Sequence, residues 1–142
     1  MHYAGFVRRL VAMIIDVFMI ISLSLLLVFL LGIFIGGMLQ ASELIKGIGN
    51  YVIMINVLIF WLYFALQESS SRQATIGKRL MGIYVASESD LPLNFAQASI
   101  RHFSKYLSSI FLIGFFMAAF TQKKQALHDI IANALVLKKE TK

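Results

Sequence analysis

The chain has 142 residues, of which 59% are hydrophobic and only 14% are charged, and its mean hydropathy is +0.80. A soluble globular protein needs more polar surface than this, so the composition predicts an integral membrane protein. The absence of cysteine excludes disulfides, thiolate metal sites and a cysteine nucleophile. The net charge of +6 does not predict nucleic-acid binding, because the basic residues flank apolar runs, where they are expected to face lipid headgroups.

The first apolar run, residues 17–42, is long enough to cross a hydrocarbon core of about 30 Å. It is too long for a signal peptide, so we interpret it as a retained anchor. Just before it, Asp16 lies within an apolar helix, where a charge costs roughly 3 to 15 kcal/mol and is therefore a candidate functional residue. Arg9 lies on the same helix face but roughly 10 Å away along the axis, too far to pair with Asp16 directly.

Two further apolar runs follow. Residues 47–67, with Tyr51 near one end and Trp61 near the other, predict a second span with aromatic residues at both interfaces. Residues 106–122 are at the lower limit of length, so this segment is either a short span or a re-entrant segment that bends near Gly114.

The distribution of basic residues favours the re-entrant alternative. In that arrangement every lysine and arginine except Lys46 lies on one side of the membrane, whereas a third crossing divides them almost evenly. We therefore predict a multi-pass protein of the cell membrane with its N-terminus and C-terminus in the cytoplasm.

Two short segments on the cytoplasmic side have the aliphatic and β-branched alternation of strands: "GIYVAS" (82–87) and "ALVLKK" (134–139). The expected fold is therefore an all-α integral membrane protein with two transmembrane helices, a third apolar helical segment and a small cytoplasmic strand pair. With one proline and no low-complexity tract, residues 1–142 read as a single domain.

No motif predicts an enzyme, a metal site or a cofactor. Gly77-Lys78 lacks the flanking glycine and hydroxyl residue of a phosphate-binding loop, so we expect Lys78 and Arg79 to face the headgroups. His128-Asp129 without further ligands is weak evidence for a metal or a catalytic dyad. Asp129 is more plausibly the partner of an arginine or a helix cap.

Two features are typical of helix packing in membranes. The sequence "GIFIG" places Gly32 and Gly36 at a small-xxx-small spacing, which predicts close packing either in a homo-oligomer or within the chain. Asn56, midway along the second run, is either a hydrogen-bonding residue between helices or incidental.

Four sequence segments together resemble the RDD family of small membrane proteins, which is named for one arginine and two aspartates. These segments are "AGFVRRLVAMIID", "ATIGKRLMGIYV", "SIRHF" and "QALHDIIANALV". The resemblance covers nearly the whole chain and implies that Arg9, Asp16 and Asp129 are the family's charged residues, with Arg101 as the additional cation we expect beside them. The family's usual Gly-Thr is Asn133-Ala134 here, and asparagine tolerates the left-handed conformation that glycine would supply.

The resemblance implies a membrane domain associated with transport, with cation/proton exchange suggested for some members. In one hypothesis Asp16 is an exchangeable carboxylate that takes a proton or a cation, which requires a homo-oligomer because so few segments cannot enclose a path. In the other, the Arg-Asp-Asp cluster is structural and the protein is a non-enzymatic membrane scaffold or assembly partner. The depth of Asp16 and the resemblance slightly favour the first hypothesis.

Overall fold

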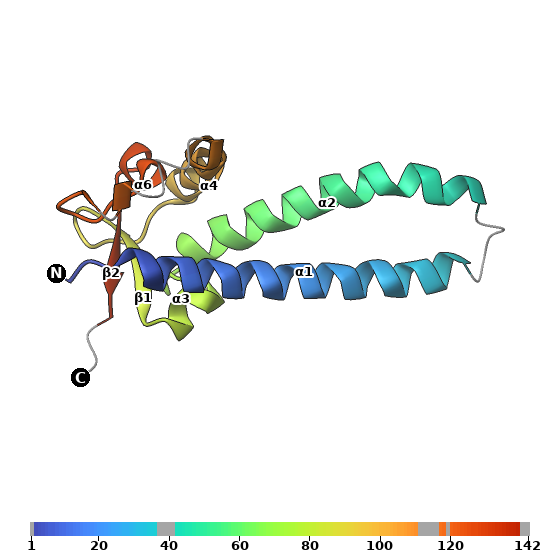
Figure 1. Cartoon of the computed structure of the whole chain (residues 1–142), viewed down its shortest axis with the longest axis horizontal. Coiled ribbons are helices and arrows are strands. Elements are labelled where there is room, and N and C mark those ends of the chain that lie inside the picture. The colour runs from blue at the N-terminus through green and yellow to red at the C-terminus, as the bar shows by residue number, and fades with distance from the viewer. Residues whose placement is uncertain (1, 37–41, 111–116, 119, 140–142) are drawn as a thin grey trace.

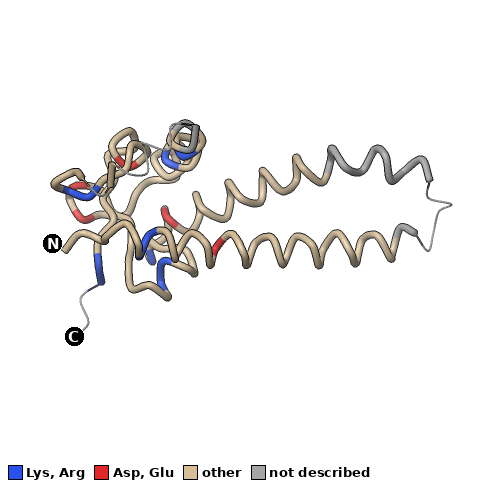
Figure 2. Tube along the Cα trace, in the orientation of Figure 1, with Lys and Arg blue, Asp and Glu red and all other residues tan. Residues whose placement is uncertain are grey.

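The computed structural model describes residues 2–36, 42–110, 117–118 and 120–139. Two long helices, α1 (Phe6–Gly36) and α2 (Ser42–Glu68), extend side by side from a group of shorter elements at one end of the molecule (Figure 1). This end also contains the first residues of the chain and its last strand. In Figure 2 the coloured Lys, Arg, Asp and Glu positions lie toward this end of the molecule. Helix α2 also carries Glu43 and Lys46 in its first turns, at the far end.

The long helices have the apolar surface of membrane segments. Within the described residues, Phe6–Phe34 of α1 is the one stretch both long and apolar enough to cross a bilayer, and most of its surface is exposed. The described apolar part of α2 is shorter and covers Val52–Glu68. The mostly helical fold and the membrane character agree with the sequence, whereas the number of spans stays a prediction.

A short helix and a strand follow α2. Helix α3 (Ile76–Leu80) begins at Thr75, whose hydroxyl accepts a hydrogen bond from the Lys78 amide at 3.4 Å. The chain then turns at Gly82, where φ is +64° and a side chain would be strained. Strand β1 (Ile83–Ser87) follows directly.

The predicted strand pair is confirmed. Strand β1 pairs antiparallel with β2 (Ala134–Lys138), so that Val85 lies opposite Val136. The N-terminal residues extend the sheet, because the Ala4 amide donates to the Val136 carbonyl at 2.9 Å and Tyr3 bridges to Leu137. The sheet contributes much of a small buried core that includes Ala4, Ala12, Ile83, Val85, Leu93, Ala132, Ala134 and Val136.

Among the described residues, the helices α4 (Phe95–Ile110) and α6 (Leu127–Ile131) follow β1. The turn between α6 and β2 has Asn133 at a φ of +48°, which confirms that asparagine adopts the left-handed conformation predicted for it. Helix α4 begins at Asn94, whose side chain accepts from the Gln97 amide at 2.8 Å, an N-terminal cap.

The third apolar segment, predicted at residues 106–122, begins within α4. This helix itself starts at Phe95, because the Asn94 cap and the polar turn before it set the start. Its polar side chains Arg101 and Ser104 are buried, whereas Ile100 and Phe103 are exposed. Gly114 and most of residues 106–122 beyond α4 lie outside the described residues, so the choice between a span and a re-entrant segment stays open.

Candidate functional site: a buried charged cluster

Six charged side chains meet where the short elements pack on the ends of α1 and α2, and we call them the charged cluster. They come from the five helices α1, α2, α3, α4 and α6: Arg9, Glu68, Lys78, Arg101, Lys105 and Asp129. The two carboxylates have 0–1% of their side-chain surface exposed. Buried charges are tolerated when they are paired and hydrogen-bonded, and each carboxylate has at least two cationic partners.

Asp129 connects α1, α4 and α6. Its carboxylate accepts from Arg101 at 2.6 and 2.8 Å and from Arg9 at 2.5 Å. It also accepts from the Ala126 amide at 3.1 Å, which caps α6. Burial alone would raise the pKa of Asp129, but Arg101, His128 and Arg9 hold it well below its usual value. Both sequence interpretations of Asp129, as an arginine partner and as a helix cap, are confirmed.

Glu68, the last residue of α2, is the second carboxylate of the cluster. It accepts from Arg101 at 2.5 Å and from Lys78 at 2.6 Å, with the Lys105 ammonium 3.6 Å away. Burial lowers the pKa of Lys78 to about 7, although Glu68 opposes the shift. Arg101 thus bridges Glu68 and Asp129, so α2, α3, α4 and α6 are joined by one ion-pair network.

The structure places Asp16 apart from this network. Its fully buried carboxylate accepts three hydrogen bonds from neutral donors: the Tyr63 hydroxyl at 2.7 Å, the Thr75 hydroxyl at 2.6 Å and the Gly77 amide at 2.7 Å. Within the described part of the chain, its hydrogen bonds come from these three neutral donors and none from a basic side chain. The sequence predicted one cluster of Arg9, Asp16 and Asp129. In the structure Arg9 pairs with Asp129, whereas Asp16 is held separately by neutral donors.

Gly77 makes the contacts of Asp16 possible. A Cβ atom at Gly77 would lie 2.2 Å from the Ala12 carbonyl oxygen and 2.9 Å from the Asp16 Cγ atom. Only glycine therefore lets α3 approach α1 closely enough for its amide to reach the carboxylate. This glycine belongs to the segment that the sequence analysis excluded as a phosphate-binding loop.

The two buried histidines add no charge to the cluster near neutral pH. Burial lowers the pKa of His128 to about 3, and its Nδ1 atom lies 3.3 Å from the Ser108 hydroxyl. Burial also lowers the pKa of His102 to about 4. Within the described residues no group of three or more His, Asp or Glu side chains is arranged to hold a metal ion.

Sequence reasoning missed Glu68, Lys78 and Lys105. Glu68 had the same signal as Asp16, a short acidic side chain at the end of an apolar run, and could have been found by it. The expectation for Lys78 was wrong, because its side chain points inward to Glu68, whereas Arg79 beside it is exposed. On a helix, neighbouring residues face about 100° apart, so one faces the cluster and the other the solvent.

The predicted helix-packing residues lie outside the site. The Asn56 side-chain amide donates to the Val52 carbonyl in its own helix at 2.8 Å, so its hydrogen bond does not join two helices. A Cβ atom at Gly32 would meet nothing within 4 Å, so no described segment packs against that glycine. The side-chain surroundings of Gly36 lie outside the described part of the chain.

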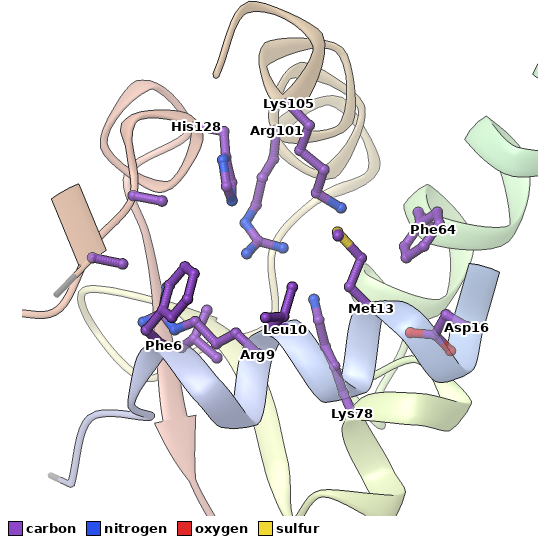
Figure 3. Close-up of a pocket in the computed structure, with 13 residues that line it drawn as sticks. Phe6, Arg9, Leu10, Met13, Asp16, Phe64, Lys78, Arg101, Lys105 and His128 are labelled. Atoms are coloured by element: carbon purple, nitrogen blue, oxygen red, sulfur yellow. The ribbon is translucent and has the colours of Figure 1, made fainter. Parts of the chain in front are cut away.

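A cavity of about 60 Å³ lies inside the charged cluster. Arg101 and Lys105 point into it from α4 and Lys78 points into it from α3 (Figure 3). Arg9, Asp16 and His128 line it as well, together with apolar side chains that include Phe6, Leu10, Met13 and Phe64. One water needs about 10–15 Å³ by this measure, so the cavity has room for about four groups of that size.

Comparison with known proteins relates the chain to one family and to two bacterial proteins. The RDD family matches residues 3–133. The chain is 33% identical to the uncharacterized protein YxaI of Bacillus subtilis (strain 168), over 96% of this chain and 97% of that protein. It is 29% identical to the uncharacterized membrane protein YteJ of the same organism, over 95% of this chain and 80% of that protein. No solved structure matches the chain.

Proposed function

Because the chain belongs to the RDD family of membrane proteins, we propose that it is a non-enzymatic membrane module in which α1 and α2 both cross the bilayer. In this proposal the charged cluster and Asp16 hold the short elements on the cytoplasmic ends of the two helices, where they form a surface for assembly with a partner. The observation that carries the proposal is the set of three donors around Asp16.

The neighbouring backbone amides suit donation by both hydroxyls to Asp16. The Tyr63 hydroxyl accepts from the Ile76 amide at 3.2 Å, and the Thr75 hydroxyl accepts from the Lys78 amide at 3.4 Å. Each hydroxyl therefore has its own hydrogen available for Asp16, and an amide donates in any case. Through these three bonds the Asp16 side chain ties α1 to α2 and to α3.

Helix α4 supports placement of this end at the membrane surface. Its apolar side chains Ile100, Phe103 and Tyr106 are each 49% exposed, whereas Arg101 is 3% exposed. A helix with its polar face turned inward and its apolar face outward suits the boundary between headgroups and acyl chains. The basic residues Arg72, Arg79, Lys123, Lys124 and Lys139 are exposed at the same end, as expected for a cytoplasmic face.

Cysteine labelling tests the proposed topology. The chain has no native cysteine, so single cysteines at Lys139 and Ser89 can be probed with a membrane-impermeant reagent in intact cells. We expect both to be labelled only after the cells are opened. External labelling at either position would overturn the cytoplasmic placement.

Cation/proton exchange by a homo-oligomer is the second candidate function. The observation that favours it is the cavity, which Asp16 lines together with the titratable Lys78. Against it, three donors from the chain itself already occupy the Asp16 carboxylate, which leaves less opportunity for an exchanging cation. Two long helices cannot enclose a path, so this function needs several copies of the chain.

Asp16→Asn separates the two functions. An asparagine oxygen can replace the carboxylate oxygen that faces Tyr63 and Gly77, but its amide then faces the Thr75 hydroxyl, whose hydrogen loses its acceptor. The lost charge and the unsatisfied hydroxyl lower the free energy of unfolding by about 1–3 kcal/mol. The structural proposal therefore expects less folded protein after solubilisation.

The matched control is Asp90→Asn, because Asp90 is exposed and forms one hydrogen bond with Tyr84. We expect this control to fold like the wild type. The exchange hypothesis instead expects Asp16→Asn to fold normally and to lose cation-driven proton flux in liposomes. Normal folding together with lost flux would reject the structural proposal in favour of exchange.

A further inference from the structure

We propose that the cavity inside the charged cluster binds a phosphate group, either free or as the headgroup of an anionic lipid. This inference adds a ligand to the cluster, and it requires neither the proposed topology nor ion exchange. It follows from the charge balance, from hydrogen-bond donors left unused and from the size of the cavity.

The charge balance around the cavity is positive. Four basic side chains of the cluster face its two carboxylates, Glu68 and Asp129, and the separate Asp16 carboxylate reduces the excess to one positive charge when Lys78, whose pKa is lowered to about 7, is protonated. His128 is neutral near pH 7. Residues 111–116 and 119, which follow α4, contain no charged side chain, so they cannot neutralise the excess. A buried excess of charge is unfavourable and favours a counter-ion.

Donors remain unused on the same side chains. The Nη2 atom of Arg9 is buried and has no hydrogen-bond partner among the described residues. Lys105 has its ammonium 3.6 Å from Glu68 and 4.3 Å from the centre of the Phe64 ring, contacts longer than a hydrogen bond. The Lys78 ammonium has three hydrogens, and among the described residues its side-chain hydrogen bond goes to Glu68.

The position of these donors suits an oxyanion. Lys105 enters the cavity from α4 and Lys78 enters it from α3, while Arg9 lines it from α1, so basic side chains reach the space from three helices between its apolar walls (Figure 3). Four oxygens around one phosphorus occupy less space than four separate waters, and the cavity of about 60 Å³ has room for about four waters. Guanidinium and ammonium groups are the usual partners of phosphate oxygens.

Thermal unfolding of the purified full-length protein in a neutral maltoside detergent tests the inference. One comparison replaces chloride with inorganic phosphate at constant ionic strength, and the second adds phosphatidylglycerol or, as its control, phosphatidylcholine. We expect a higher Tm with phosphate than with chloride, or with phosphatidylglycerol than with phosphatidylcholine. A higher Tm with phosphate assigns the site to a free phosphate. A higher Tm with phosphatidylglycerol but not with phosphate assigns it to a lipid headgroup. No preference in either comparison would overturn the inference.

Lys105→Gln locates the binding site, because Lys105 has the loosest contacts of the cluster. We expect it to weaken the preferred ligand about tenfold or more, whereas Lys123→Gln, which removes an exposed lysine paired with Glu88, leaves binding unchanged. Equal binding by both variants would place the ligand elsewhere and reject the site. If Lys105→Gln does not fold, Lys105→Met serves in its place, since an apolar side chain of similar length removes the charge without an unpaired amide. Lys105→Arg should retain binding.

Discussion

Substitution of Gly77 by alanine should separate α3 from α1. The added Cβ atom would lie 2.2 Å from the Ala12 carbonyl oxygen, about 1 Å closer than such atoms normally approach. The obstructing atom belongs to the backbone of α1, so α3 must move by about that distance. The hydrogen bonds from Thr75 and Gly77 to Asp16, now 2.6 and 2.7 Å, would then exceed hydrogen-bonding distance.

The expected loss of stability follows from these contacts. Each hydrogen bond to an ionised acceptor contributes about 1.5–3 kcal/mol, so loss of both lowers the free energy of unfolding by about 3–6 kcal/mol. For a chain of this length, 1 kcal/mol shifts Tm by a few degrees, so a fall of about 10 °C or more is expected. Fluorescence of Trp61, which packs on α4 through Phe103, can follow unfolding in detergent.

The control substitution is Gly32→Ala. A Cβ atom at Gly32 would meet nothing within 4 Å, and alanine favours a helix more than glycine does. We expect this variant to melt at or slightly above the wild-type temperature. A Gly77→Ala protein that melts within about 2 °C of Gly32→Ala would refute the close approach of α3 to α1.

Two further predictions concern the charged groups. Glu68→Gln removes the partner of Arg101 and Lys78 and should lower the free energy of unfolding by about 3–5 kcal/mol. The control Glu88→Gln breaks an exposed ion pair that contributes about 0–1 kcal/mol. Equal yields of folded protein from the two variants would contradict the buried network. His128 has its pKa lowered to about 3, so between pH 6.5 and 3 the unfolded chain binds a proton that the folded chain does not. Stability therefore falls with falling pH by about 1.4 kcal/mol per unit from this group. The Tm of His128→Gln should fall less between pH 7 and 5 than that of the wild type or His2→Gln, and identical pH profiles would reject this role.

Local sequence determined the features that depend on neighbouring residues. Alternation of aliphatic residues predicted the two strands, whose bounds differ from the prediction by one residue at an end. The left-handed turn at Asn133 followed from the conformational preference of that one residue. The family pattern and the burial of Asp16 were also readable from the sequence, because a short carboxylate in an apolar run cannot reach water.

Only the tertiary structure decided what each buried charge contacts. The donors to Asp16 lie 47 to 61 residues away along the chain, and they reach it because Gly77 has no side chain to hold the two helices apart. Glu68 joins the network because α2 ends where α3 and α4 meet. The sequence gives the charges and their depth, but their partners depend on which helices pack together, and distance along the chain does not determine that packing.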